Sequence, residues 1–120
     1  MSTVLHDKLF MRLDDLPVLA HMTYDASADP YAVTVAFTDG TFVYAEWRLD
    51  RGMLRDGMRR PVGEGDVRVR PGVHIELCGQ ADFTVAEDSL QRFLERTYEM
   101  VPEGEERVDM DALVARLLAG

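Results

Sequence analysis

The chain of 120 residues contains one cysteine, three histidines and no long uninterrupted run of apolar residues. A single cysteine, Cys78, can form neither an internal disulfide nor a cysteine-rich metal site. This scarcity of cysteine fits a reducing compartment. No segment approaches the roughly 20 apolar residues of a membrane-spanning helix. Charged side chains interrupt Leu5–Leu13, so this segment does not resemble the apolar core of a signal peptide. These absences predict a soluble cytoplasmic protein without membrane insertion.

Positive charge is also scarce. The chain has 13 Lys and Arg residues against 22 Asp and Glu residues, which gives a formal net charge of −9. Neutralisation of phosphates supplies most non-specific affinity for nucleic acid, so we do not expect nucleic acid as the main partner. The charge is uneven, however, since six arginines and only three carboxylates fall between residues 51 and 70.

That arginine-rich segment is the candidate partner-binding surface for an acidic partner. The candidate residues are Arg55, Arg59, Arg60, Arg68 and Arg70. The alternative is that these arginines lie on a solvated rim and pair with carboxylates of the same chain, where exposed ion pairs contribute little.

Alternation of apolar and polar residues predicts an antiparallel, β-rich core of about seven strands, mostly consecutive hairpins. The predicted strands cover residues 5–13, 18–24, 31–37, 42–49, 67–70, 73–77 and 81–85. Asp39-Gly40 predicts a hairpin turn, because glycine adopts a positive φ without steric cost.

The strand at residues 42–49 is apolar on both faces, so it is either central or faces a second subunit. Trp47 shares its face with Val43 and Leu49 and is predicted to lie in the core. Phe42 and Tyr44 point to the other face and are the candidate oligomer interface.

Three helices complete an α+β fold of one domain, residues 1–120. Asp50 caps a short helix over 51–56, which Gly57 is predicted to end in a left-handed conformation. The glycine- and proline-rich stretch 58–65 is predicted to be irregular. An amphipathic stripe from Leu90 to Val101 predicts the second helix, with Asp88 as its cap, and a third follows over 110–118, capped by Asp109.

No pattern in the chain indicates chemistry. The three histidines, His6, His21 and His74, have no metal-ligand spacing. The Gly63–Asp66 loop lacks the Lys-Ser/Thr end of a phosphate-binding loop. Cys78 is predicted to be a packed thiol. We therefore expect no catalytic residue, no metal site and no cofactor, and hence no enzyme.

A connected series of residues resembles the SsgA-like proteins, an actinobacterial family that acts in sporulation-linked cell division. The matching positions are Tyr24, Asp29-Pro30-Tyr31-Ala32-Val33, Trp47, Arg51, Leu54, Gly57, Pro61, Gly63, Gly65-Asp66-Val67 and Pro71, then Phe93-Leu94-Glu95-Arg96-Thr97, Val101-Pro102 and Gly104-Glu105. The turn at Pro71-Gly72 is shorter than in the members that the chain resembles most.

The resemblance implies a homotrimer with a barrel-like core of two antiparallel sheets and a topology similar to the whirly single-strand-binding proteins. It also implies an adaptor without a cofactor, which helps to position the septum through the division GTPase FtsZ or other SsgA-like proteins. The alternative is a single-stranded nucleic-acid-binding module, with Phe42, Tyr44 and Trp47 as stacking platforms.

Overall fold

The computed structural model describes residues 3–14, 16–38, 41, 43–79, 81–107 and 110–119. Within these residues the strands are β1 (Val4–Leu13), β2 (Leu16–Asp25), β3 (Ala32–Thr38), β4 (Val43–Asp50), β5 (Val62–Glu64), β6 (Val67–Arg70), β7 (His74–Leu77) and β8 (Ala81–Val85). The helices are α1 (Arg51–Gly57), α2 (Glu87–Met100) and α3 (Met110–Ala119).

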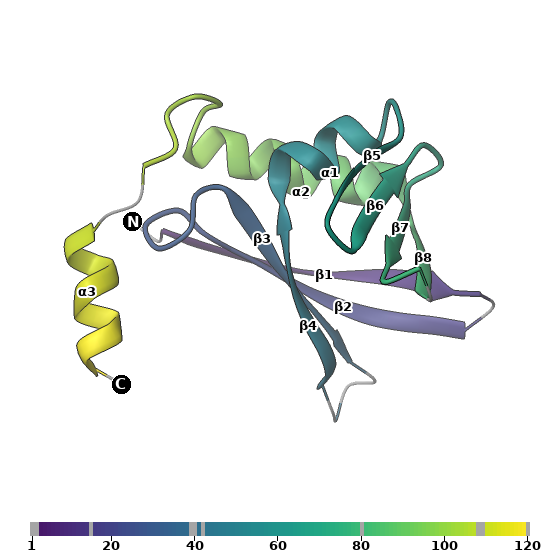
Figure 1. Ribbon diagram of the computed structural model, residues 1–120, viewed down its shortest axis with the longest axis horizontal. Coiled ribbons are helices and arrows are strands. Elements are labelled where there is room, and N and C mark those ends of the chain that lie inside the picture. Colours follow the sequence, from purple (N-terminus) through teal and green to yellow (C-terminus); the bar gives the residue numbers. More distant parts are fainter. Residues whose placement is uncertain are drawn as a thin grey trace.

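The strands form one antiparallel sheet in the order β4-β3-β2-β1-β8-β7-β6-β5. β1 pairs with β2 along its whole length but with β8 only through Met11–Leu13. The two halves of the sheet therefore diverge beyond this short contact, and the sheet curls into a half-barrel. Helices α1 and α2 lie together on one side of the sheet, whereas α3 stands apart from it (Figure 1).

The α+β class, the antiparallel pairing and the three helices predicted from the sequence are confirmed. The structure has eight strands where about seven were predicted, because Val62–Glu64 pairs with Val67–Val69 inside the stretch expected to be irregular. Gly65 forms the turn between them at a φ of 58°. The two sheets implied by the family resemblance are joined into a single sheet through β1.

The core lies between the inner face of the sheet and α2. Alternate strand residues such as Leu9 and Met11 point inward, as a period of two requires. Leu90, Phe93 and Leu94 of α2 are buried against this face at helical spacing. Each fully buried apolar side chain of this size contributes roughly 1.5–3 kcal/mol relative to exposure. This packing makes α2 the lid over one end of the half-barrel.

The local helix signals had mixed outcomes. The Asp50 side chain accepts a hydrogen bond from the backbone N–H of Met53 (2.8 Å), so the predicted cap of α1 is confirmed. The predicted cap at Asp88 is wrong: α2 begins after Ala86, and no side chain caps it. The capping bond marks where α1 begins, whereas α2 begins without a side-chain cap and has Glu87 and Asp88 in its first turn.

Gly57 is not the left-handed terminator predicted from the sequence, because it lies inside α1 with a negative φ. A Cβ at this position would lie 2.2 Å from Cγ1 of Val69 on β6. Glycine is therefore required by the close approach of α1 to the sheet. The predicted turn at Asp39-Gly40 and the predicted cap at Asp109 lie outside the described residues.

None of the helices in the described part of the chain has the length and apolarity needed to cross a membrane.

Replacing Gly57 with alanine is expected to lower the free energy of unfolding by about 1–3 kcal/mol, because the added methyl group overlaps Val69. Gly52→Ala in the same helix is the control. Its Cβ would meet only Oδ1 of the capping Asp50, at 3.1 Å, so a small shift of this carboxylate offsets part of the preference of about 1 kcal/mol for alanine over glycine in helices. Urea denaturation of both variants measures the difference; equal losses would contradict the packing argument.

Candidate partner-binding surface

The five candidate arginines do not form one patch. Helix α1 packs on the inner face of β6 through Gly57, so Arg55 and the following Arg59 and Arg60 lie on the helix side of the sheet. On β6, Arg68 and Arg70 alternate with the buried Val67 and Val69, so they point to the outer face. The structure therefore divides the candidate residues into an α1 group and an outer-face group.

Two of these arginines form short ion pairs within the chain. Arg55 donates to the Glu103 carboxylate from Nη1 (2.8 Å) and from Nη2 (3.1 Å). This hydrogen bonding raises the pKa of Arg55 and lowers the pKa of Glu103. Arg70 donates to Asp82 at 2.7 Å on the outer face. For Arg55 and Arg70 the structure thus shows the internal pairing that was the alternative to partner binding.

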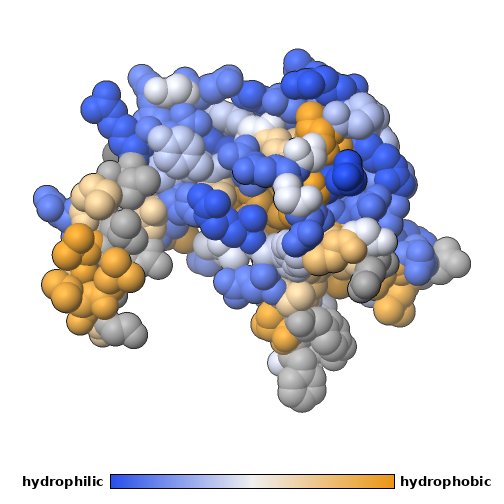
Figure 2. All heavy atoms as spheres, viewed as in Figure 1, coloured by the Kyte–Doolittle hydropathy of each residue, from blue (hydrophilic) through white to orange (hydrophobic). Residues whose placement is uncertain are grey.

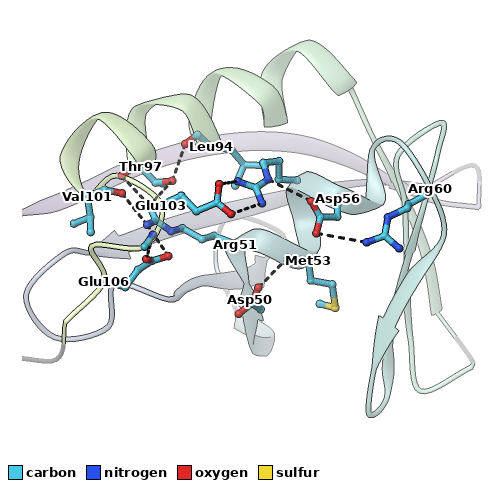
Figure 3. Close-up of polar contacts among 12 residues, drawn as sticks. Asp50, Arg51, Met53, Asp56, Arg60, Leu94, Thr97, Val101, Glu103 and Glu106 are labelled. Atoms are coloured by element: carbon cyan, nitrogen blue, oxygen red, sulfur yellow. Dashed lines mark hydrogen bonds and ion pairs between the residues drawn. The ribbon is translucent and has the colours of Figure 1, made fainter.

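The other three charges are more available. Arg60 lies 4.0 Å from its nearest carboxylate partner, Asp56 (Figure 3). Arg59 and Arg68 are exposed and form no ion pair within the described residues. The α1 group therefore presents Arg59, which has no ion pair among the described residues, and Arg60, whose ion pair with Asp56 is long.

Arg59 also borders a cleft of about 210 Å³ between α1 and α2. The cleft is lined by Arg55, Met58, Arg59, Glu87, Gln91, Leu94, Glu95 and Tyr98. Its apolar part, formed by the half-buried Met58 and Tyr98 over the buried Leu94, can receive one apolar side chain of a partner. Arg59 can at the same time meet a neighbouring carboxylate of that partner. We call this cleft together with Arg59 and Arg60 the α1 surface.

Arg51, the first residue of α1, is excluded from any contact surface because its side chain is only 1% exposed. Its Nη1 donates to the carbonyl of Thr97 (2.9 Å) and its Nη2 to the carbonyl of Val101 (2.7 Å), both at the end of α2. Nη2 also lies 3.1 Å from the Glu106 carboxylate (Figure 3). The guanidinium is 4.0 Å from the centroid of the Tyr98 ring. One arginine thus joins α1 to α2 and to the segment that follows it.

Two tyrosines complete this cluster around Arg51. The Tyr24 ring lies 5.2 Å from the guanidinium, and its hydroxyl donates to the carbonyl of Pro30 (2.8 Å). Burial raises the pKa of Tyr24 to about 12, although the charge of Arg51 acts in the opposite direction. Tyr31 donates to the Glu106 carbonyl (3.0 Å). Glu106 has a lowered pKa, because its own backbone N–H and then Arg51 stabilise the carboxylate.

The buried role of Arg51 could not be derived from the sequence, because its partners lie 46 and more positions away. A signal was nevertheless present. Tyr24, Pro30, Tyr31, Thr97 and Val101 of this cluster all belong to the positions that carry the family resemblance. Because these residues all lie around Arg51, the positions that carry the family resemblance coincide with this structural centre of the fold.

The candidate oligomer-interface residues cannot be placed, since Phe42 and the side chain of Tyr44 lie outside the described residues. Trp47, predicted to be in the core, is only partly buried. It lines an open apolar groove of about 470 Å³ with Leu13, Leu16, Val18, Phe37, Ala45, Leu77, Cys78, Ala81 and Phe83. Cys78 is exposed at this groove, so the prediction of a packed thiol is wrong.

The histidines have ordinary strand surroundings. His6 lies 3.0 Å from the Thr23 hydroxyl, and His74 lies 3.3 Å from the Asp82 carboxylate. Among the described residues, no group of three or more His, Cys, Asp or Glu side chains is placed to hold a metal ion.

Fold and surface together define a small α+β half-barrel domain with a buried arginine at its centre. A family model described as "Streptomyces sporulation and cell division protein, SsgA" matches residues 18–106. The chain therefore belongs to the SsgA family, whose members are regulators of sporulation and cell division.

Individual relatives agree with this assignment. The chain is 43% identical to the sporulation-specific cell division protein SsgB of Salinispora tropica, over 88% of this chain and 82% of the relative. It is 38% identical to SsgB of Streptomyces coelicolor, over 99% and 98% of the two chains. The crystal structure of an SsgA-like sporulation-specific cell division protein from Thermobifida fusca superimposes with a TM-score of 0.81 at 36% identity, covering 95% of this chain and 94% of that one. These relatives support a role in sporulation-specific cell division.

Arg51→Met is expected to lower the free energy of unfolding by on the order of 3 kcal/mol, because it leaves a carboxylate and two carbonyls without their buried donor. Chemical denaturation measures this loss, and hydrogen exchange is expected to show faster opening of residues 101–106. Arg55→Met removes an ion pair that is shorter than that of Arg51 (2.8 against 3.1 Å) but more exposed, and is expected to change stability by less than about 1 kcal/mol. If the two variants lose the same stability, the central role of Arg51 is refuted.

Proposed function

We propose that this protein is a non-enzymatic adaptor that helps to position the septum during sporulation-specific cell division. The observation that carries the proposal is the match to SsgB of Streptomyces coelicolor over 99% of this chain and 98% of the relative. The match spans nearly the full length of both chains, so the likeness is not confined to one element of the fold. The proposed partners are the division GTPase FtsZ or other SsgA-like proteins.

The proposed adaptor is a cytoplasmic homotrimer that is recruited to the division septum. A trimer presents three copies of one surface, and contacts of modest strength then add up, because each bound copy raises the effective concentration of the next. This arrangement suits a polymeric partner, which repeats its own binding site along the filament.

The α1 surface is the proposed contact site of the adaptor. Arg59 forms no ion pair among the described residues, Arg60 forms only a long one with Asp56, and the adjoining cleft offers space for an apolar anchor. Arg55 is held by Glu103 and frames the cleft. Arg68 and Arg70 lie on the opposite face and cannot reach the same partner residue as Arg59.

Nucleic acid binding is a weaker candidate for this surface. The net charge of −9 opposes approach to phosphate, and the structure divides the arginines between two faces instead of joining them in a basic groove. Random single-stranded DNA is therefore the parallel control ligand in the test that follows.

Co-sedimentation with polymerised FtsZ from an actinobacterium tests the proposal. We expect saturable pelleting of the wild-type protein with the filaments and roughly tenfold weaker binding of the Arg59→Glu, Arg60→Glu double variant, as for the loss of exposed charges at an interface. The variant is expected to keep the wild-type melting temperature, because both side chains lie on the surface.

Arg68→Glu, Arg70→Glu is the matched control, with the same change of charge on the outer face. Its pelleting is expected to equal that of the wild type once its folding has been verified, since Arg70 pairs with Asp82. Weaker binding by this control alone would move the contact site to the outer face. Wild-type protein that binds DNA but not FtsZ or any SsgA-like protein would overturn the adaptor proposal.

A further inference from the structure

Helix α3 is an apolar helix whose described side chains lie largely exposed. Eight of the ten residues in Met110–Ala119 are apolar, and only Asp111 and Arg116 carry charge. Leu117 and Leu118 are 72% and 83% exposed, and Met110 and Val114 are exposed as well. Figure 1 shows α3 apart from the half-barrel, and Figure 2 shows its apolar side chains gathered on the surface. A helix that is apolar on nearly all sides requires a cover from outside this arrangement.

The open end of the half-barrel presents the complementary surface. Helix α2 covers one end of the inner sheet face, and the groove at Trp47 occupies the other end, where no helix of the described residues contributes to its lining. Its lining is apolar throughout apart from the Cys78 thiol, with Leu16 63% exposed. One chain therefore carries both an uncovered apolar helix and an uncovered apolar groove. Grooves of this kind receive amphipathic helices in other proteins.

The helix does not cover the groove of its own chain in this structure. Arg51 fixes Glu106 beside Tyr24, and the register of the sheet places Trp47, at the near rim of the groove, two residues along the strands from Tyr24. Leu13, at the far rim, lies roughly 26 Å along β1 from the row of Tyr24 and Leu5, at about 3.3 Å per residue. Helix α3 follows Glu106 but stands apart from the half-barrel, so its own chain leaves the groove open (Figure 1).

We propose that α3 of one copy docks into the open groove of a second copy. The inference rests on the self-association proposed above and names the surfaces that produce it. Each copy then gives one helix and receives another, which is a heterologous contact that closes into a ring when the rotation between neighbours permits it. In a three-membered ring every α3 is docked and every groove is filled, so neither apolar surface remains exposed.

The native cysteine provides the test, because Cys78 lies in the groove and is the only cysteine of the chain. Single cysteines are placed on α3 as Val114→Cys, Leu117→Cys or Leu118→Cys, and the full-length proteins are oxidised mildly. Docking holds two thiols together, so we expect disulfide-linked dimers and trimers at least roughly tenfold faster than for an undocked pair of cysteines. Lys8→Cys, which is exposed on the outer face, gives that reference rate.

Two matched variants test the groove itself. Leu16→Glu places a charge in the groove at an already exposed position and is expected to slow cross-linking from α3 to the reference rate. Phe10→Glu is a similar change at a side chain 75% exposed outside the groove, and it is expected to leave cross-linking unchanged. A Cys78→Ser background must abolish the products and so confirms which thiol reacts.

Light scattering of the wild-type protein separates this inference from the proposed function. A trimer whose α3 cysteines react no faster than Lys8→Cys overturns the docking of α3 and leaves the proposed trimer intact. Disulfides that form within one chain, seen as monomers of altered mobility, overturn it as well, because α3 would then cover its own groove. A wild-type monomer at all concentrations removes the proposed trimer together with this inference.

Discussion

The burial of Arg51 is the constraint on which the rest of this structure depends. A guanidinium removed from water destabilises the fold unless its donors and its charge find partners. Arg51 finds two carbonyls at the end of α2, the carboxylate of Glu106 and two aromatic rings, and only its Nε lacks a hydrogen bond within the described residues. These partners can be met only if β4 ends, α1 begins and α2 stops at one place.

The same cluster makes the two ends of the half-barrel different. At the Arg51 end, α1 and α2 cover the inner face, and the exposed cations of the α1 surface stand beside their cleft. At the other end the sheet curls without a helix to cover it, which leaves the apolar groove at Trp47. A charged surface and an apolar groove are thereby held apart on one domain. This separation is compatible with the proposal that a partner and a further copy of the protein bind at different surfaces.

Predictions from the sequence were mostly correct where the physical cause is local, although the cap at Asp88 and the hairpin of β5 and β6 were misread. The alternation of apolar residues identifies the strands, and Asp50 identifies the start of α1 by a hydrogen bond to a residue three positions on. They were wrong where a distant element decides. Gly57 is glycine because Val69 approaches it. Trp47 and Cys78 are partly or fully exposed because no helix reaches their end of the sheet, which nothing in the local pattern indicates.

By itself the sequence determined the α+β class, the antiparallel hairpins, the positions of the helices and the family, because all of these depend on neighbours in the chain or on residue identity at fixed spacing. Only the tertiary structure decided how five nearby arginines divide between two faces, and that Arg51 is interior rather than a contact residue. Alternation with a period of two shows that successive residues point to opposite sides of a strand. It does not state which element will cover each side, since that depends on packing between residues far apart in sequence.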